Sequence, residues 1–180
     1  MSASFGMQVL RSIPLFNGLN ETECRQIAEV IQMHSYAAGD AVIRQGESSR
    51  NLWVLLDGSC EVAKRLLQDD PDSESVLLAT VEPYQHFGEM SFFHPAPHSA
   101  DVRAKTNVKV LRISHVDYQD LIAEGVWAAY KLAYNVVQGL AERMRRMDDW
   151  VTDLMLRQKE AVTQAEWSEF REKLFSGWNA

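Results

Sequence analysis

The feature that most constrains the fold is a series of short strand-like segments between His34 and Ile113. They are rich in β-branched and other apolar residues, and residues that favour turns separate them. The segments that we expect to form strands are Ala41–Arg44, Leu52–Leu56, Cys60–Lys64, Val76–Val81, Ala100–Ala104 and Val108–Ile113. Six or more short strands at this spacing are typical of a barrel or jelly roll. The sequence therefore predicts a mainly β protein with flanking helices, built on a jelly-roll β-barrel.

Turn signals separate these segments at Gly39-Asp40, Gln45-Gly46-Glu47 and Asp57-Gly58. Asp-Gly is the dipeptide best suited to a tight hairpin, because glycine adopts positive φ without steric cost. We therefore expect a hairpin at Asp57-Gly58. The acidic stretch Gln68–Ser75 is expected to form a solvated hairpin tip.

A helix is predicted before the barrel, from Asn20 to Met33. Asn20 can cap this helix, and Glu23 stands at the position that completes a capping box. One buried stripe would be formed by the apolar residues at i, i+3, i+4 and i+7. These are Cys24, Ile27, Ala28 and Ile31.

The helical period returns after Val116, and a single helix is expected from about Val126 to Arg157. At 1.5 Å per residue this helix would be roughly 50 Å long, too long to lie wholly on a small barrel. Its apolar residues alternate gaps of three and four, which is the pattern of a coiled-coil seam. The seam residues are Val137, Leu140, Met144, Met147, Val151 and Leu154. We predict a homodimer through this seam; the alternative is a helix packed on its own domain.

The chain then continues as a tail in which Trp167, Phe170 and Leu174 are spaced as one helical face. This short amphipathic helix could dock on a partner protein, or it could fold back onto the dimer. The predicted organisation is a barrel with N-terminal helices over residues 1–125, a dimerisation helix over 126–158 and the tail over 159–180.

The stretch from Phe87 to Ala104, FGEMSFFHPAPHSADVRA, is the most informative about function. It predicts a strand end, a glycine, a short turn of helix, a proline-bounded loop and a new strand. A glycine that opens a helical turn leaves backbone N–H groups free and lets an anion approach closely. Glu89 would stand beside that anion. A carboxylate is expected there only if it accepts a hydrogen bond from a hydroxyl group. A ribose hydroxyl next to a phosphate meets both requirements.

This stretch resembles the phosphate-binding cassette of the cyclic nucleotide-binding domain family, which includes the catabolite activator protein and the regulatory subunits of protein kinase A. The resemblance covers roughly Leu10–Leu154. Outside the FGE…SA…VRA cassette, it rests on Ile13–Leu19, Gly39, Ile43, Gln45-Gly46-Glu47, Trp53, Gly58, Leu111-Arg112-Ile113 and Tyr118. It implies a cyclic nucleotide-binding jelly-roll barrel followed by a long dimerisation helix and a short C-terminal helix.

Carried over residue by residue, the resemblance implies a set of ligand contacts. Gly88 and Met90 would offer backbone groups to the ligand, and Glu89 would accept a hydrogen bond from the ribose 2′-hydroxyl. Ser99 would bind the cyclic phosphate. In the family's dimers the base is met near the middle of the long helix, which by position indicates Arg143 and its neighbours.

The main departure from the family pattern is His98, which stands where the phosphate-binding arginine is expected. Arginine presents a permanently charged fork to phosphate, whereas histidine is mostly neutral at pH 7. Losing one charge-assisted hydrogen bond costs on the order of 1.5–3 kcal/mol, so weakened binding is expected. Arg103 could replace the charge, but its odd spacing from His98 along a strand predicts the opposite face and a structural role. Tyr84 is a second departure from the family pattern, in which a glycine is common at this position before the cassette.

Residues in and near this stretch also suggest a metal site or an enzyme active site. A metal site could use His86, Glu89, His94 and His98, but their spacing lacks the HxH…E pattern of adjacent strand positions. No HExxH, GxSxG or GxxxxGK motif is present, and the adjacency of residues in Ser114-His115-Val116-Asp117 does not make a catalytic triad. We therefore expect neither a metal site nor an enzyme.

Charge and the remaining segments argue against nucleic acid, membrane and secretion. The formal net charge is −7, whereas nucleic-acid binders usually carry a basic patch. No basic recognition helix of a helix-turn-helix domain follows the long helix, so direct DNA binding is not expected. Neither a signal sequence nor an apolar stretch of about 18 residues is present. Cys24 and Cys60 are isolated thiols, typical of a reducing compartment, so a cytoplasmic protein is expected.

Two functions fit these observations. The first is a regulatory sensor module that binds cyclic AMP, cyclic GMP or a related anionic small ligand and signals to a partner through helix rearrangement, with no other cofactor required. The alternative is a degenerate barrel that binds no nucleotide and acts as a dimeric protein-interaction scaffold. Occupancy of the cassette distinguishes the two.

Overall fold

A computed structural model of the protein describes residues 7–66, 74–157, 168, 169 and 172. The chain divides into two units, residues 1–136 and residues 137–180, which are described separately. The helices and strands, in chain order, are α1 (Met7–Ser12), η1 (Pro14–Phe16), α2 (Glu21–Val30), β1 (Gln32–Tyr36), β2 (Ala41–Ile43), β3 (Asn51–Asp57), β4 (Cys60–Arg65), β5 (Ser75–Val81), β6 (His86–Phe87), α3 (Glu89–Phe93), β7 (Asp101–Ala104), β8 (Val108–Ser114), α4 (His115–Ala123) and α5 (Trp127–Arg157).

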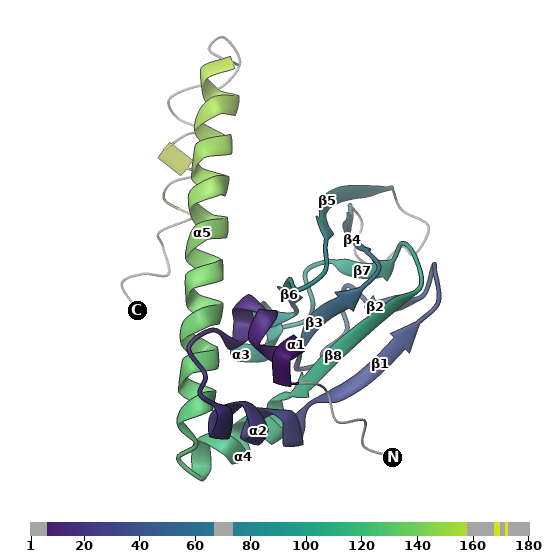
Figure 1. Ribbon diagram of the computed structural model, residues 1–180. Helices are drawn as coiled ribbons and strands as arrows, with labels where there is room; N and C mark the ends of the chain where they lie inside the picture. The colour runs from purple at the N-terminus through teal and green to yellow at the C-terminus, as the bar shows by residue number, and fades with distance from the viewer. Residues whose placement is uncertain (1–6, 67–73, 158–167, 170–171, 173–180) are drawn as a thin grey trace. The chain divides into compact units, whose positions relative to one another are not determined.

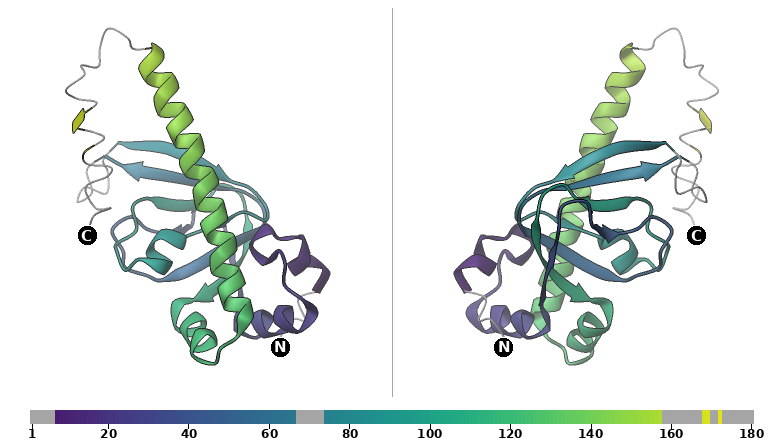
Figure 2. Two further views of the ribbon diagram at one scale, coloured as in Figure 1. Left: turned by 90° about the vertical axis from the view of Figure 1, so that its left-hand side faces the viewer. Right: turned by 90° about the vertical axis from the view of Figure 1, so that its right-hand side faces the viewer.

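The first unit contains two four-stranded antiparallel sheets (Figure 1). The strand order is β1-β8-β3-β6 in the first sheet and β2-β7-β4-β5 in the second. Both views of Figure 2 show α2 and α4 at the same end of these sheets. The prediction of a mainly β jelly roll with flanking helices and a long helix is confirmed.

The hairpin predicted at Asp57-Gly58 was wrong. β3 and β4 flank this turn but belong to different sheets, so the turn is a corner that carries the chain from one sheet to the other. Gly58 has φ +84°, and a Cβ there would lie 2.4 Å from the carbonyl oxygen of Asn107. The glycine is therefore required both for its conformation and for the close approach of the neighbouring loop.

The middle residues of β3 are buried on both faces of the first sheet, which explains the apolar character of this strand. On its inner face Trp53, Leu55 and Val110 join residues of the second sheet in one core cluster. On the opposite face, four residues of β3 and β8 are also at most 2% exposed. They are Leu52, Val54, Leu111 and Ile113. Alternation along β3 and β8 thus supplies two apolar layers.

The predicted helix from Asn20 was correct at its start and wrong at its end. Asn20 Oδ1 accepts from Glu23 N at 2.9 Å and Glu23 Oε2 accepts from Asn20 N at 2.7 Å, the two bonds of a capping box. The helix ends at Val30, because Ile31 is extended and the next five residues pair with β8. Strand β1 was not predicted, since pairing with a distant strand decides it. The strand end predicted at Phe87 is found as the two-residue β6.

The first turns of α5 belong to the first unit and are fastened to its N-terminal segment. Lys131 Nζ donates to Gly18 O at 2.9 Å and to Glu23 Oε2 at 2.8 Å. Asn135 Nδ2 donates to the carbonyl oxygens of Leu15 and Asn17, both at 2.9 Å. Lys131 is also the main reason why the pKa of Glu23 is lowered. The segment before α2 is thereby linked to α5 by side chains from two successive turns.

In the second unit, α5 continues to Arg157. Four of the predicted seam residues are between 39% and 61% exposed within the chain: Val137, Met144, Met147 and Leu154. Leu140 and Val151 are partly buried. The continuous helix agrees with the sequence, while the dimer through this seam stays a prediction. Trp167, Phe170 and Leu174 of the tail lie outside the described residues.

Candidate ligand-binding site

Gly88 joins β6 to α3 and opens the candidate site. Its φ of +84° lies in the left-handed region, which favours glycine. A Cβ at this position would lie 2.7 Å from Asn51 O and 3.1 Å from Trp53 Cδ1. The backbone of the cassette therefore packs directly on β3, and only glycine fits there. The prediction of a glycine that opens a short helical turn is confirmed.

The first two residues of α3 face in different directions. The side chain of Glu89 is 4% exposed, whereas that of Met90 is 63% exposed. This arrangement fits a buried carboxylate and a residue that offers only its backbone. Gly88 is the N-cap residue of α3 and supplies no side-chain cap. The first N–H groups of any helix have no acceptor within the helix itself.

Arg50 holds α3 from the opposite end. Its guanidinium donates to Ser91 O at 3.3 Å from Nε and to Phe92 O at 2.8 Å from Nη2. A positive charge at the C-terminal carbonyls of a helix is favourable both as a cap and towards the helix dipole. Sequence reasoning missed Arg50, because its partners are more than forty positions away and no local motif marks it.

Phe92 connects the cassette helix to α4. Its side chain is fully buried, and its ring centroid lies 5.4 Å from that of His115 and 5.1 Å from that of Tyr118. Tyr118 in turn donates from its hydroxyl group to Ala129 O of α5 at 3.4 Å. Edge-on aromatic contacts of this kind fix the relative position of the elements that they join. A shift of α3 would therefore displace side chains of α4 and, through Tyr118, the first turns of α5.

The ring of His98 is engaged within the protein. His98 is 5% exposed, and its Nε2 lies 2.8 Å from Ser49 Oγ. Its backbone pairs with the loop after β2: His98 N donates to Glu47 O at 3.0 Å, and Gly46 N donates to His98 O at 2.9 Å. Burial lowers the pKa of His98, partly opposed by the nearby Glu47 carboxylate and by Ser49. The ring therefore carries no charge near neutral pH.

Ser99 follows His98 and is exposed. The structure thus places the serine of the cassette at the surface and the histidine beneath it. The contacts predicted for Gly88, Glu89, Met90, His98 and Ser99 stay predictions, because they concern a ligand. For His98 to meet a phosphate through its side chain, Ser49 would have to share or release the ring.

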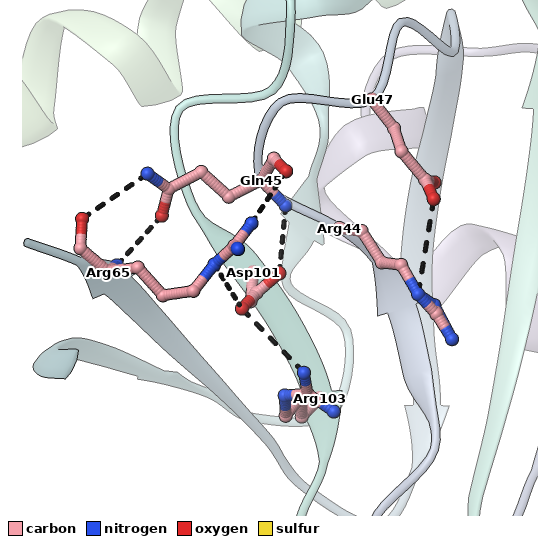
Figure 3. A network of polar contacts seen from close by, with 6 residues as sticks. All are labelled: Arg44, Gln45, Glu47, Arg65, Asp101 and Arg103. Atoms are coloured by element: carbon pink, nitrogen blue, oxygen red, sulfur yellow. Dashed lines mark hydrogen bonds and ion pairs between the residues drawn. The ribbon is translucent and has the colours of Figure 1, made fainter. Parts of the chain in front are cut away.

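A polar network fixes the loop that carries Ser49 and Arg50 (Figure 3). Asp101, which is 5% exposed, accepts from Gln45 N at 2.8 Å and lies 3.5 Å from Arg65 Nε. Arg65 Nη2 donates to Gln45 O at 2.8 Å, and Arg65 N donates to Gln45 Oε1 at the same distance. This network joins the start of the loop to β4 and β7.

Arg103 belongs to the same network rather than to the phosphate position. Its Nη2 lies 3.8 Å from Asp101 Oδ2, and its side chain is 54% exposed (Figure 3). This ion pair agrees with the structural role that the strand spacing predicted. Asp101 therefore faces two arginines, Arg65 and Arg103, and its negative charge compensates theirs.

The residues considered for a metal do not form a metal site. In the described part of the chain, no three His, Cys, Asp or Glu side chains lie close enough together to hold a metal ion. His86, Glu89, His94 and His98 all belong to this described part. In addition, none of the helices among the described residues is long and apolar enough to cross a membrane.

Residues 33–125, more than half of the chain, match the cyclic nucleotide-binding domain family. The chain belongs to this family. The matched region includes the barrel, the cassette helix α3 and α4. The glycine turn, the buried Glu89 and the exposed Ser99 all lie within the matched region.

The similar proteins include a regulatory subunit and a transcriptional regulator. The chain is 26% identical over 118 residues to the cAMP-dependent protein kinase regulatory subunit of Schizosaccharomyces pombe, covering 66% of this chain and 27% of the subunit. It is 23% identical over 148 residues to the CRP-like cAMP-activated global transcriptional regulator of Mycobacterium tuberculosis, covering 82% of this chain and 62% of the regulator. The chain thus spans only part of the length of these relatives.

Solved structures agree on the fold. The catabolite activator protein of Thermus thermophilus is 26% identical with a TM-score of 0.66, covering 78% of this chain and 62% of that chain. The N-terminal domain of a transcriptional regulator from Streptomyces coelicolor is 29% identical with a TM-score of 0.62. The match covers 79% of this chain and 94% of that domain. The regulatory subunit of a cAMP-independent protein kinase A from Trypanosoma brucei is 26% identical with a TM-score of 0.60. The match covers 73% of this chain and 46% of that subunit.

Proposed function

We propose that the chain is a homodimeric regulatory module that binds cyclic AMP, cyclic GMP or a related small anion in its cassette. The observation that carries the proposal is the left-handed Gly88 turn at the start of α3, with Glu89 buried beside it. The named relatives in which this domain occurs are cAMP-dependent or cAMP-activated regulators. A cyclic nucleotide presents both groups that such a turn and carboxylate would recognise, an anionic phosphate and a ribose hydroxyl.

In the proposed complex each cassette residue has a role. Backbone groups of Gly88 and Met90 contact the ligand, Glu89 accepts the ribose 2′-hydroxyl, and the Ser99 hydroxyl donates to the cyclic phosphate. Position 98 contributes no charge, because burial keeps its imidazole neutral. Compared with a site that has arginine there, the loss is on the order of 1.5–3 kcal/mol, or roughly ten- to a hundred-fold in affinity.

The proposed signal passes from α3 to α5. A ligand that draws in the start of α3 would move Phe92, whose ring packs against Tyr118. Tyr118 is bonded to Ala129 at the start of α5. A ligand that prefers one position of this helix shifts the population towards it. The change would reach a partner protein through the dimer seam, Arg143 and the tail.

One observation favours the alternative, a dimeric scaffold that binds no nucleotide. The residue at the arginine position is buried, neutral and bonded to Ser49. A structural relative with the same fold is the regulatory subunit of a cAMP-independent kinase. In the scaffold function the barrel would only present α5 and the tail to a partner.

Calorimetric titration of the chain with cyclic AMP and cyclic GMP separates the two functions. The sensor requires saturable binding of at least one nucleotide, weakened by Glu89→Gln, which removes the negative charge of the acceptor. His94→Ala is a matched control, because His94 is an exposed residue just after α3. Absence of binding by the wild-type chain would favour the scaffold. Equal weakening by both variants would remove Glu89 from the site.

A further inference from the structure

Three nitrogen-bearing side chains meet on the inner face of the first sheet. Trp53 of β3 stands opposite Arg112 of β8, and His34 of β1 stands opposite Val110 of β8. Val110 belongs to the inner core cluster, as Trp53 does. The ring centroids of His34 and Trp53 are 5.7 Å apart. Side chains directly opposite each other on antiparallel strands are neighbours, so the three groups lie together.

Each of these side chains has a buried nitrogen with no hydrogen-bond partner among the described residues. The atoms are Trp53 Nε1, Arg112 Nε and His34 Nε2. Trp53 is only 4% exposed, so its indole N–H is deeply buried. Most buried polar atoms in proteins are bonded, and each exception calls for an explanation. The indole and guanidinium nitrogens are donors only, so an acceptor is what the group lacks.

Arg112 also lacks a counterion within the described part of the chain. No carboxylate there forms an ion pair with it, although Arg65 and Lys131, which are likewise partly buried, each have one. The charge of Arg112 acts on neighbouring groups. The pKa of His34 is lowered mainly by burial and further by the positive charge of Arg112. The pKa of Tyr36 is raised by burial and, to a smaller extent, by the Asp40 carboxylate, and Arg112 opposes that rise.

We propose that Arg112, Trp53 and His34 form a binding site for the phosphate or carboxylate group of a small molecule, in addition to the cassette. An oxyanion is an acceptor and carries negative charge, which is what the donors and the unpaired guanidinium require. The residues Arg112 and His34 are partly exposed as a whole, whereas Trp53 is buried and its indole N–H would form the floor of the site.

The proposed site is next to the cassette but uses different residues. Trp53 packs against the backbone of Gly88, since a Cβ there would lie 3.1 Å from Trp53 Cδ1. An anion held by Arg112 and Trp53 is thus separated from the cassette glycine by one side chain. A second ligand at this position would act on the cassette through the Trp53 ring.

Titration of the ¹⁵N-labelled chain with inorganic phosphate, and separately with acetate, tests the site by NMR. The Trp53 indole N–H resonance, assigned with Trp53→Phe, should shift and saturate. Arg112→Gln should weaken the affinity by at least about ten-fold, the usual effect of losing a charge-assisted hydrogen bond. Lys109→Gln is the matched control: it removes the same charge from the same strand, three positions away, where Lys109 is exposed.

The outcomes separate the possibilities. Tighter binding of phosphate or of acetate assigns the ligand class, and the absence of a saturable shift with both overturns the proposal. Equal weakening by Arg112→Gln and Lys109→Gln would show only general electrostatic attraction and would also overturn it. Ser99→Ala distinguishes the proposed site from the cassette. If the shift of the Trp53 resonance with phosphate disappears in this variant, phosphate binds in the cassette instead. Circular dichroism of each variant, with Arg112→Lys as a milder replacement, excludes misfolding as the cause.

Discussion

Replacing His98 by arginine should strengthen the binding of cyclic AMP or cyclic GMP. Because burial lowers the pKa of His98, the wild-type side chain brings no positive charge to the cassette near neutral pH. A guanidinium is permanently charged and can pair with a phosphate through two parallel hydrogen bonds. One added charge-assisted bond contributes about 1.5–3 kcal/mol, which corresponds to roughly ten- to a hundred-fold in Kd.

The same substitution should lower the stability of the free protein. It removes the 2.8 Å bond between the ring of His98 and Ser49 Oγ, which contributes about 0.5–1.5 kcal/mol. The two backbone bonds between position 98 and the loop at Gly46 and Glu47 do not depend on the side chain. The expected result is therefore a protein that unfolds more easily by about 1 kcal/mol and binds nucleotide at least about ten-fold more tightly.

Calorimetric titration with both nucleotides gives the affinity, and urea unfolding gives the stability. Ser49→Ala is the control, because it removes the same side-chain bond without adding a charge. It should lose a similar amount of stability with no gain in affinity as large as that of His98→Arg. A folded His98→Arg variant whose Kd equals that of the wild type would refute the reasoning, since position 98 would then not face the phosphate.

Gly88→Ala should destabilise the protein more than Gly39→Ala. Both glycines have positive φ, which costs an alanine about 1–2 kcal/mol, but only at Gly88 would the new Cβ meet the backbone; equal losses in urea unfolding would contradict this. Met144→Glu combined with Met147→Glu should give a chain that is folded by circular dichroism but sediments as a monomer, because like charges would face their copies across the seam. A variant that stays dimeric, or a wild type that is already monomeric, would exclude that interface. Finally, the melting temperature should fall as the pH is lowered from 7.5 to 5. Burial lowers the pKa of three histidines in the folded chain, so their stabilisation is present above the unfolded value of about 6.5 and is lost as the pH falls through the folded values. A melting temperature that is constant over this range would contradict it. These histidines are His34, His98 and His115.

Much of the architecture was readable from local patterns in the sequence. The strand at Val108–Ile113 was predicted because its apolar residues and flanking turns are a local signal, and β8 is found there. The capping box at Asn20 and Glu23 was predicted for the same reason, since both partners lie within one helical turn. Gly88 at the start of a short helix was recognisable from the cassette motif. These features depend on neighbours in the chain, which a sequence displays directly.

The tertiary structure decided which distant residues meet. Sequence periodicity assigns a residue to a face, but it does not say which residue of another strand or loop stands opposite. For this reason β1 was missed, and the Asp57-Gly58 corner was predicted as a hairpin. The partners of His98 and Arg50 are 49 and more than 40 positions away, so neither contact leaves a local signal.

The cassette shows this division most clearly. The residue types and their resemblance to the family's cassette predict that Gly88, Glu89 and Ser99 meet a phosphate and a ribose, and that His98 stands where an arginine is expected. Only the fold shows that the ring of His98 is buried against Ser49, and burial is what makes it neutral. The charge of an imidazole depends on its surroundings, and these come from parts of the chain that folding brings together.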